Sequence, residues 1–176
     1  MYIDIQYYKS PFGELVLGSY EQQLCLCDWR YRRMRTAIDT RIQKLTGATY
    51  REMPNSIHQK TINQLEEFAQ GERTTFDIPL CFVGSTFQQN VWQQLLKIPF
   101  GKTISYLQLS QQFGDEKAIR AVAMANGANA LSIIVPCHRV IGSKGDLVGY
   151  AGGLAVKKQL LLLENATTTS NQFSLF

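Results

Sequence analysis

The stretch from Ile133 to Ile141, which reads Ile-Ile-Val-Pro-Cys-His-Arg-Val-Ile, constrains the fold of this chain more than any other. Apolar, β-favouring residues lie on both sides of its centre, and this pattern predicts a buried strand that a tight turn interrupts. Pro136 fixes its own φ and removes a backbone donor, so Cys137 is expected in a defined place at that turn. A neighbouring histidine, His138, can activate the thiol. We therefore treat Cys137 as a candidate nucleophile.

Length and composition indicate an ordered protein. The 176 residues are 45% hydrophobic, enough for one sizeable core or two smaller ones, and only 18% are charged, which argues against broad disorder. The chain does not begin with a basic segment followed by an apolar run, so no secretory signal is expected. No apolar stretch approaches the roughly 20 residues needed to span a bilayer. We expect a soluble, cytoplasmic protein without a membrane partner.

Basic charge is concentrated in the second half. Residues 86–176 carry eight Lys/Arg and four Asp/Glu, whereas residues 1–85 carry ten of each. The whole charge excess of +4 therefore lies in the half of the chain that contains Cys137. A modest basic surface suits a polyanion such as nucleic acid. Charge alone is better explained by a slightly basic domain with no anionic partner.

The other three cysteines predict no metal site. The chain has no C-x-x-C sequence, which argues against a thioredoxin-type motif or a zinc knuckle. Cys25 and Cys27 alternate with leucines in a predicted strand and are interpreted as small core residues. A zinc site from Cys25, Cys27, Cys81 and His58 is the alternative, but its spacing matches no known signature.

The first half predicts an antiparallel meander followed by two helices. Alternating apolar residues place strands at 2–8, 15–18 and 24–27. Helical spacing appears at Ile38, Ile42 and Leu45 and again from Thr61 to Ala69, and the polar residues 46–56 are predicted as loop.

Four arginines precede the first helix: Arg30, Arg32, Arg33 and Arg35. We interpret them as a solvated surface, with an auxiliary DNA contact as the alternative. Residues 75–82 predict an extended segment, and a boundary near residues 80–85 divides the chain into domains 1–82 and 83–176.

The second half predicts a helix-turn-helix. A helix begins at Thr86, and Ser105 is a natural N-cap for another that starts at Tyr106. Gly114 suits the position after that helix, and Asp115 can cap the next one. A closing helix from Leu154 to Glu164 is strongly apolar, with Lys157 and Lys158 predicted on its polar side.

The second helix of the pair separates its side chains by size. A helical wheel places three apolar residues on the buried face: Ile119, Val122 and Ala123. The outward face carries one long cation among small or unbranched side chains: Arg120, Ala121 and Met124. This arginine could contact phosphate or fill a vacated base position. The alternative is an ordinary surface helix.

These motifs together closely resemble those of the DNA alkylguanine alkyltransferases. The resemblance rests on Pro-Cys-His-Arg-Val-Ile at 136–141, Gly-Lys-Thr-Ile-Ser-Tyr at 101–106, Arg-Ala-Val at 120–122, Asn-Gly at 126–127 with Asn129, and Gly-Tyr-Ala-Gly-Gly-Leu at 149–154. It runs from about Thr86 to Asn165. The first 85 residues are similar only in the order of their elements and in a linker, Phe-Asp-Ile-Pro-Leu at 76–80.

The resemblance implies an α+β protein with a ribonuclease H-like N-terminal α/β domain and a mostly helical C-terminal domain with a winged-helix-like helix-turn-helix. It implies repair by direct reversal, in which an alkyl group moves from guanine O6, less readily from thymine O4, to the protein's own cysteine. The transfer is irreversible, so one molecule is consumed per lesion. The implied partner is double-stranded DNA containing alkylated guanine, with the second helix in the minor groove. A monomer without cofactors is expected.

The resemblance also implies roles for individual residues. Cys137 accepts the alkyl group, His138 removes its proton, and Glu164 orients the imidazole. Tyr106 protonates the departing guanine, and Asn129 braces the turn before the cysteine. The implied DNA contacts are Arg120, which replaces the flipped base, with Ala121, Met124, Ser105 and Tyr106. The implied lining of the base pocket is Tyr150, Ala151, Gly152 and Val140.

Three positions depart from the family pattern. Ala130 and Ser132 stand where the family often has proline, and Ala123 stands where it usually has glycine. The loss of two prolines is expected to loosen the loop that leads to the cysteine. Our hypothesis is that methyl transfer survives while the preference among larger alkyl groups changes, which rates on methyl and benzyl adducts would test.

Three other classes of protein fit the residues less well. A cysteine protease needs a distant histidine, and only His58 is available, without an oxyanion signature. A plain helix-turn-helix regulator would need no Pro-Cys-His-Arg sequence. A non-catalytic, lesion-binding relative of the alkyltransferases would lack the reactive cysteine, and here Cys137 is present.

Overall fold

The computed structural model describes residues 1–166, and the chain divides into two compact units. The first unit combines Met1–Ser85 with Ala130–Ile134, and the second combines Thr86–Asn129 with the chain from Val135 onward. The change of unit after Ser85 lies close to the predicted boundary. The return of residues 130–134 to the first unit was not predicted, because local sequence patterns do not report which distant strand a segment joins.

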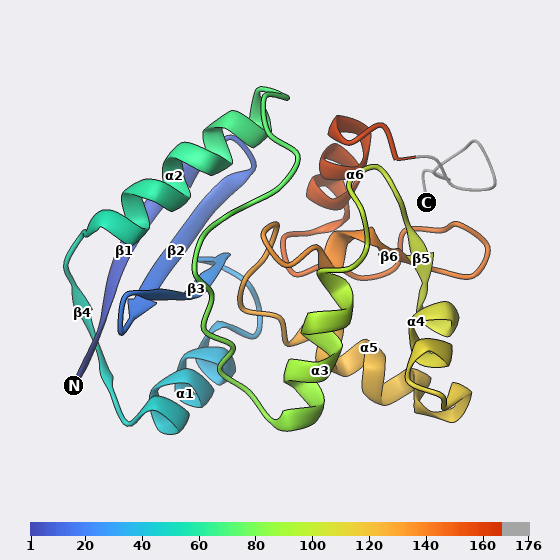
Figure 1. The fold of residues 1–176 in the computed structure, drawn as a ribbon, viewed down its shortest axis with the longest axis horizontal. Helices are drawn as coiled ribbons and strands as arrows, with labels where there is room; N and C mark the ends of the chain where they lie inside the picture. The colour runs from blue at the N-terminus through green and yellow to red at the C-terminus, as the bar shows by residue number, and fades with distance from the viewer. Residues whose placement is uncertain (167–176) are drawn as a thin grey trace. The chain divides into compact units, whose positions relative to one another are not determined.

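A four-stranded sheet forms the centre of the first unit (Figure 1). Its strands are β1 (Tyr2–Ser10), β2 (Gly13–Tyr20), β3 (Gln23–Trp29) and β4 (Thr49–Glu52), in the order β3-β2-β1-β4. The first three strands are antiparallel, so the predicted meander is confirmed. Both faces of the sheet are covered, and β3 is buried from Leu24 to Trp29.

Two helices cover this sheet. α1 (Arg35–Thr46) places Ile38 and Ile42 in the same apolar core as Ile3 and Ile5 of β1. α2 (Ser56–Ala69) contacts β1, β2 and β3. It begins five residues before the predicted start, because the Asn55 side chain accepts hydrogen bonds from two amides of the first turn.

The prediction of loop for residues 46–56 is wrong at β4. Thr49–Glu52 pairs with β1 in parallel, from Tyr2 opposite Thr49 to Ile5 opposite Glu52. Three of its four residues are exposed and the fourth is half-buried. An edge strand of this kind shows no apolar alternation, and the edge of β1 supplies the pairing that the sequence pattern does not reveal.

The cysteines of the first unit lie in or beside the core. Cys25 and Cys27 are buried free thiols, which confirms their interpretation as core residues. The register of β2 and β3 shifts beside Cys25. Within residues 1–166, no three His, Cys, Asp or Glu side chains are gathered in a way that could hold a metal ion.

The arginine cluster is not the solvated surface that we predicted. Arg32 is only 9% exposed and pairs with the buried carboxylate of Asp28, to which Arg35 also donates. Arg30 pairs with Glu14 at 3.1 Å. The sequence shows four adjacent cations, but carboxylates from neighbouring positions on the strands neutralise three of them.

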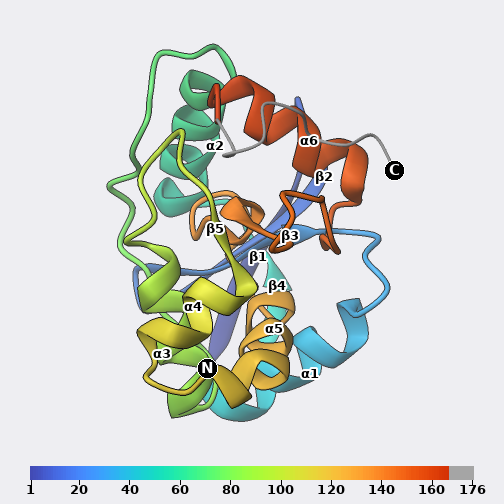
Figure 2. The same cartoon turned by 90° about the vertical axis from the view of Figure 1, so that its right-hand side faces the viewer.

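The second unit contains α3 (Thr86–Leu95), α4 (Tyr106–Gln112), α5 (Ile119–Gly127) and α6 (Leu154–Leu163). Two short parallel strands, β5 (Ile104–Ser105) and β6 (Val140–Ile141), pair beside them. α3, α4 and α5 cluster together (Figure 2), and the indole of Trp92 on α3 donates to the Ala125 carbonyl of α5 at 2.8 Å.

The helix-turn-helix is confirmed as α4 followed by α5. Ser105 and Gln108 form a reciprocal capping box at the start of α4. Gly114 has a φ of +74°, as its place after a helix requires, and Asp115 caps a 3₁₀ turn over Glu116–Ala118 that leads into α5.

The predicted strand around the cysteine is mostly absent. Residues 132–134 form a compact turn, and Cys137–Arg139 form a 3₁₀ turn, so only Val140–Ile141 are strand. The β-branched residues of this run are buried rather than extended, since Ile133 and Val135 are at most 1% exposed. Burial and strand formation give the same composition in a short apolar run, so the pattern alone could not separate them.

No helix within residues 1–166 is long and apolar enough to cross a membrane.

Candidate active site

Cys137 begins the 3₁₀ turn and is 4% exposed. Its amide donates to the Val135 carbonyl at 2.8 Å, which curls the chain tightly around Pro136. The side chain of Asn129, itself buried, donates to the same carbonyl at 2.9 Å. The Asn129 side chain is thus hydrogen-bonded to the turn that precedes Cys137.

His138 lies fully buried against Glu164. Its Nε2 is 2.8 Å from Oε1 of Glu164, although the two residues are 26 positions apart. Glu164 is at the C-terminal end of α6, so the closing helix carries the carboxylate to the histidine. Burial lowers the pKa of His138, while the hydrogen bond from its ring to Glu164 acts in the opposite direction.

Arg139 is a site residue that the sequence analysis missed. Its guanidinium donates from Nε and Nη2 to both carboxylate oxygens of Glu164, at 2.8–3.2 Å, and from Nη1 to the Ile98 carbonyl at 2.6 Å. The side chain is 8% exposed, and the Glu164 side chain is fully buried. Its position beside His138 in the signature could have indicated a paired cation.

The carboxylate of Glu164 is held in its ionised form. Burial alone would raise its pKa, but hydrogen bonds from His138 and Arg139 lower the pKa to about 2. The amide of Gly101 also donates to it, at 3.4 Å. A permanent negative charge therefore faces the imidazole at neutral pH.

Two tyrosines approach the same region. The Tyr106 hydroxyl donates to the Val148 carbonyl at 3.3 Å, and the ring of Tyr150 stands edge-on to His138 with centroids 6.5 Å apart. Burial raises the pKa of Tyr106 to about 12, and negative charge on Cys137 acts in the same direction. Tyr106 therefore keeps its proton at neutral pH.

The structure differs from the prediction at Lys157, which was placed on the polar side of the closing helix. Lys157 is fully buried, and its ammonium donates to the carbonyls of Val140, Val148 and Gly149 at 2.7, 3.1 and 3.2 Å. It joins the strand after the cysteine to the glycine-rich loop. Burial lowers its pKa to about 8, and negative charge on Cys137 acts in the opposite direction.

We expect this buried ammonium to give an alkaline signature in stability. The unfolded chain holds the proton of Lys157 up to its ordinary pKa of 10.5, whereas the folded chain releases it near pH 8. The unfolded state binds more protons in this window, so stability rises with pH.

The free energy of unfolding of the wild type minus that of Lys157→Met should increase by about 2–3 kcal/mol between pH 8 and pH 10.5. Denaturant titrations at several pH values measure it. The same difference for Lys158→Met should stay flat, and a flat difference for Lys157→Met would disprove the assignment.

The predicted DNA-contacting face of α5 is exposed. Arg120 and Ala121 lie open to solvent, and Met124 is 77% exposed, whereas Val122 is fully buried. Ile119 and Ala123, predicted as buried, are only half-buried, and Ala125 and Asn126 complete the inward face instead. Ser105 is occupied as the N-cap of α4.

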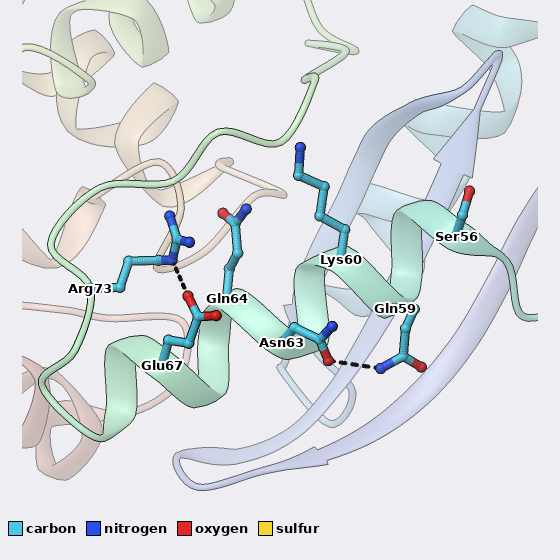
Figure 3. Close-up of a pocket in the computed structure, with 7 residues that line it drawn as sticks. All are labelled: Ser56, Gln59, Lys60, Asn63, Gln64, Glu67 and Arg73. Atoms are coloured by element: carbon cyan, nitrogen blue, oxygen red, sulfur yellow. Dashed lines mark hydrogen bonds and ion pairs between the residues drawn. The ribbon is translucent and has the colours of Figure 1, made fainter.

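The predicted pocket residues differ in exposure. Tyr150, Ala151 and Gly152 are half-buried in the loop before α6, whereas Val140 is fully buried. A separate surface hollow lies on α2, and none of the predicted site residues lines it (Figure 3). Its lining is polar, with Arg73 paired to Glu67 at 2.6 Å and Gln59 bonded to Asn63 at 2.8 Å.

Comparison with known proteins places this arrangement in a family. Residues 3–82 match the ribonuclease-like domain of 6-O-methylguanine DNA methyltransferases, and residues 86–166 match their DNA binding domain. A methylated-DNA–protein-cysteine methyltransferase of Mycobacterium bovis is 41% identical over 160 residues, which cover 89% of each chain. The chain belongs to the 6-O-methylguanine DNA methyltransferase family.

Two further relatives support membership of this family. The constitutive methylated-DNA–protein-cysteine methyltransferase of Bacillus subtilis is 39% identical over 159 residues, covering 88% of this chain and 90% of the relative. The crystal structure of Mycobacterium tuberculosis OGT in complex with DNA is 38% identical, covers 92% of both chains, and superposes with a TM-score of 0.77. The predicted α+β class, with a ribonuclease-like first domain and a helical DNA-binding second domain, is confirmed.

Proposed function

We propose that this protein repairs DNA by direct reversal, transferring an alkyl group from guanine O6, and less readily from thymine O4, to Sγ of Cys137. The observation that carries the proposal is the buried contact between His138 and Glu164 beside Cys137, in a chain of the methyltransferase family. The proposed partner is double-stranded DNA that contains alkylated guanine.

The chemistry begins with the thiol proton. A free cysteine has a pKa of about 8.5, and only the thiolate attacks. The carboxylate of Glu164 accepts from Nε2–H of His138, and no group within residues 1–166 hydrogen-bonds Nδ1 of that ring. Nδ1 can therefore take the Cys137 proton, directly or through a water, and Glu164 stabilises the resulting imidazolium.

The thiolate then displaces guanine from the alkyl carbon. A bond forms between Sγ and that carbon, the bond from carbon to O6 breaks, and the electron pair leaves with guanine. The guanine anion needs a proton, and the neutral phenol of Tyr106 is the proposed donor. The product is a thioether that nothing in the site can hydrolyse, so one protein molecule is consumed per lesion.

DNA engagement is assigned to α5. The target atom lies inside the duplex, so the base must be flipped out before transfer. Arg120 stands on the exposed face with Ala121 and Met124, where small side chains allow the helix to approach the minor groove and the arginine to replace the flipped base. A monomeric state and a cytoplasmic location are further predictions.

The experiment that tests this function weighs the modified peptide. The protein is incubated with a duplex containing one O6-methylguanine, digested, and the peptide containing Cys137 is analysed by mass spectrometry. A gain of one methylene group on that peptide is expected, and a duplex with unmodified guanine should give none. An unmodified peptide after full contact with the lesion would favour the alternative, a non-catalytic lesion-binding helix-turn-helix protein.

Arg120→Ala should slow repair of duplex DNA about 10- to 100-fold, because the vacated position in the stack is left empty; this corresponds to about 1–3 kcal/mol. Single-turnover transfer on a duplex and on the same lesion in a single strand measures it. The single strand needs no extrusion and should show a smaller loss. Arg33→Ala, which removes an exposed arginine of the first unit, is the matched control. Equal losses on both substrates would contradict the assigned role.

A further inference from the structure

Asp28, near the end of β3, has a fully buried carboxylate at the centre of a polar cluster. Arg32 donates from Nη1 to both of its oxygens at 3.0 and 3.1 Å, and Arg35 donates to Oδ2 at 2.9 Å. The third partner comes from far along the chain, because the hydroxyl of Ser132 donates to Oδ1 at 3.1 Å across 104 positions. We refer to Asp28, Arg32, Arg35 and Ser132 as the Asp28 cluster.

The segment Ala130–Ile134 is also bonded to β3 through its backbone. The amide of Cys27 donates to the Ala130 carbonyl, and the amide of Ser132 donates to the Cys27 carbonyl, both at 2.8 Å. Cys27 and Leu131 form an isolated parallel bridge. Ala130 is 6% exposed and Ser132 is fully buried, so water does not compete for these bonds.

A strained residue lies inside this segment. Ile133 has a φ of +71°, in the left-handed region that a β-branched side chain rarely enters, and it is 1% exposed. Such a backbone conformation costs about 1–3 kcal/mol and persists only where surrounding contacts hold the residue in it. The Ser132 hydroxyl and amide precede the strained residue directly, and only three residues separate it from Cys137.

We propose that Asp28 and Ser132 are positioning residues for alkyl transfer, which hold the strained turn at Ile133 and so fix the backbone from which Cys137 attacks. This inference rests on the proposed function. The hydrogen bond from Ser132 joins the paired carboxylate of Asp28 to the segment that continues through Ile134, Val135 and Pro136 to the nucleophile.

The cluster also accounts for one departure from the family pattern, the serine at position 132. The missing prolines at Ala130 and Ser132 were expected to loosen the loop through chain entropy. A proline at position 132 would lack the amide that Ser132 donates to Cys27, and it would lack the hydroxyl that reaches Asp28. Here hydrogen bonds supply the restraint that a proline ring would supply by fixing φ.

Ser132→Ala is the variant that tests the proposal. Substitution of Asp28 would leave two arginines facing each other without a carboxylate and could prevent folding. Ser132→Ala removes one hydroxyl and leaves the ion pairs of Asp28 intact. Thr61→Val is the matched control, because Thr61 is a fully buried hydroxyl of the first unit that donates to the Ile57 carbonyl within α2.

Single-turnover transfer is measured against the concentration of O6-methylguanine duplex, at a temperature where all three proteins are folded. We expect Ser132→Ala to lower the rate constant at saturating DNA about 10-fold, with the half-saturating concentration unchanged, since misplacing a reacting group by less than 1 Å carries such a cost. Thr61→Val should keep the wild-type rate constant. A wild-type rate constant in Ser132→Ala, or an equal loss in Thr61→Val, would overturn the proposal.

Amide hydrogen exchange gives a second readout that does not need activity. Exchange at Ser132 and Ile134 should quicken about 10-fold in Ser132→Ala and not in Thr61→Val; unchanged exchange in Ser132→Ala would also overturn the proposal. If the wild type transfers no alkyl group, the proposed function fails. If it transfers normally and Ser132→Ala does so at the same rate, only the positioning role fails.

Discussion

Cys137→Ser is expected to abolish alkyl transfer while the fold and the binding of damaged DNA survive. A serine hydroxyl at the same 3₁₀ turn has a much higher pKa than a thiol, and His138 cannot convert a useful fraction of it to the anion. The loss in the rate of transfer should exceed about 1,000-fold. The substitution exchanges one buried atom, so the free energy of unfolding should change little.

Intact-mass measurement after incubation with an O6-methylguanine duplex checks this expectation, and a gel-shift titration checks binding. Cys81→Ser is the matched control, because Cys81 is a free, half-buried thiol of the first unit. The Cys81→Ser protein should still take the methyl group onto Cys137, as the wild type does. Transfer that persists in Cys137→Ser, or that disappears in Cys81→Ser, would show that the acceptor was wrongly assigned.

Glu164→Gln should lower both stability and the rate of transfer. The buried carboxylate balances the cation of Arg139 and accepts from His138, and a neutral amide cannot do either task fully. Removing one partner of a buried ion pair costs about 3–5 kcal/mol at neutral pH. Transfer should slow about 10- to 100-fold, because the imidazolium of His138 loses its stabilising charge.

The loss of stability should depend on pH with a defined sign. The pKa of Glu164 is about 2 in the folded chain and 4.5 as an ordinary glutamate, so the unfolded state binds more protons between these values. The stabilisation is therefore present above pH 4.5 and is lost as the pH falls towards 2. The difference between wild type and Glu164→Gln should be about 3 kcal/mol larger at pH 7 than at pH 2.

Urea titrations at several pH values measure this difference. Glu67→Gln provides the control, because Glu67 pairs with Arg73 on the surface of the first unit, where its side chain is 42% exposed. Exposed pairs of this kind contribute about 0–1 kcal/mol. A deficit for Glu164→Gln that is small at pH 7, or that is equal at both ends of the range, would contradict the buried-pair assignment.

The residues of the proposed site could largely be named from the sequence, because their signals are local or carried by the family motifs. Cys137, His138 and Asn129 lie within ten residues of one another, and capping residues mark the start of α4 and of the 3₁₀ turn that leads into α5. Glu164 was assigned through the resemblance, and the structure brings it to His138. The order of strands in the meander followed from alternation over adjacent segments.

Only the tertiary structure decided which charged groups are buried and what they bond. Lys157 has the same sequence surroundings as the half-buried Lys158, but three carbonyls of distant residues enclose its ammonium. Arg139 pairs with Glu164, 25 positions away, and Asp28 accepts a hydrogen bond from Ser132, 104 positions away. Likewise, β4 exists because β1 offers a free edge, and the apolar run before Cys137 becomes a strained turn because β3 binds it. The sequence by itself determined most of the helices and pointed to the proposed nucleophile and its histidine, since spacing, capping and adjacent motifs act over a few residues. The burial of charges and the path of the cysteine segment depend on long-range contacts, and no local pattern contains them.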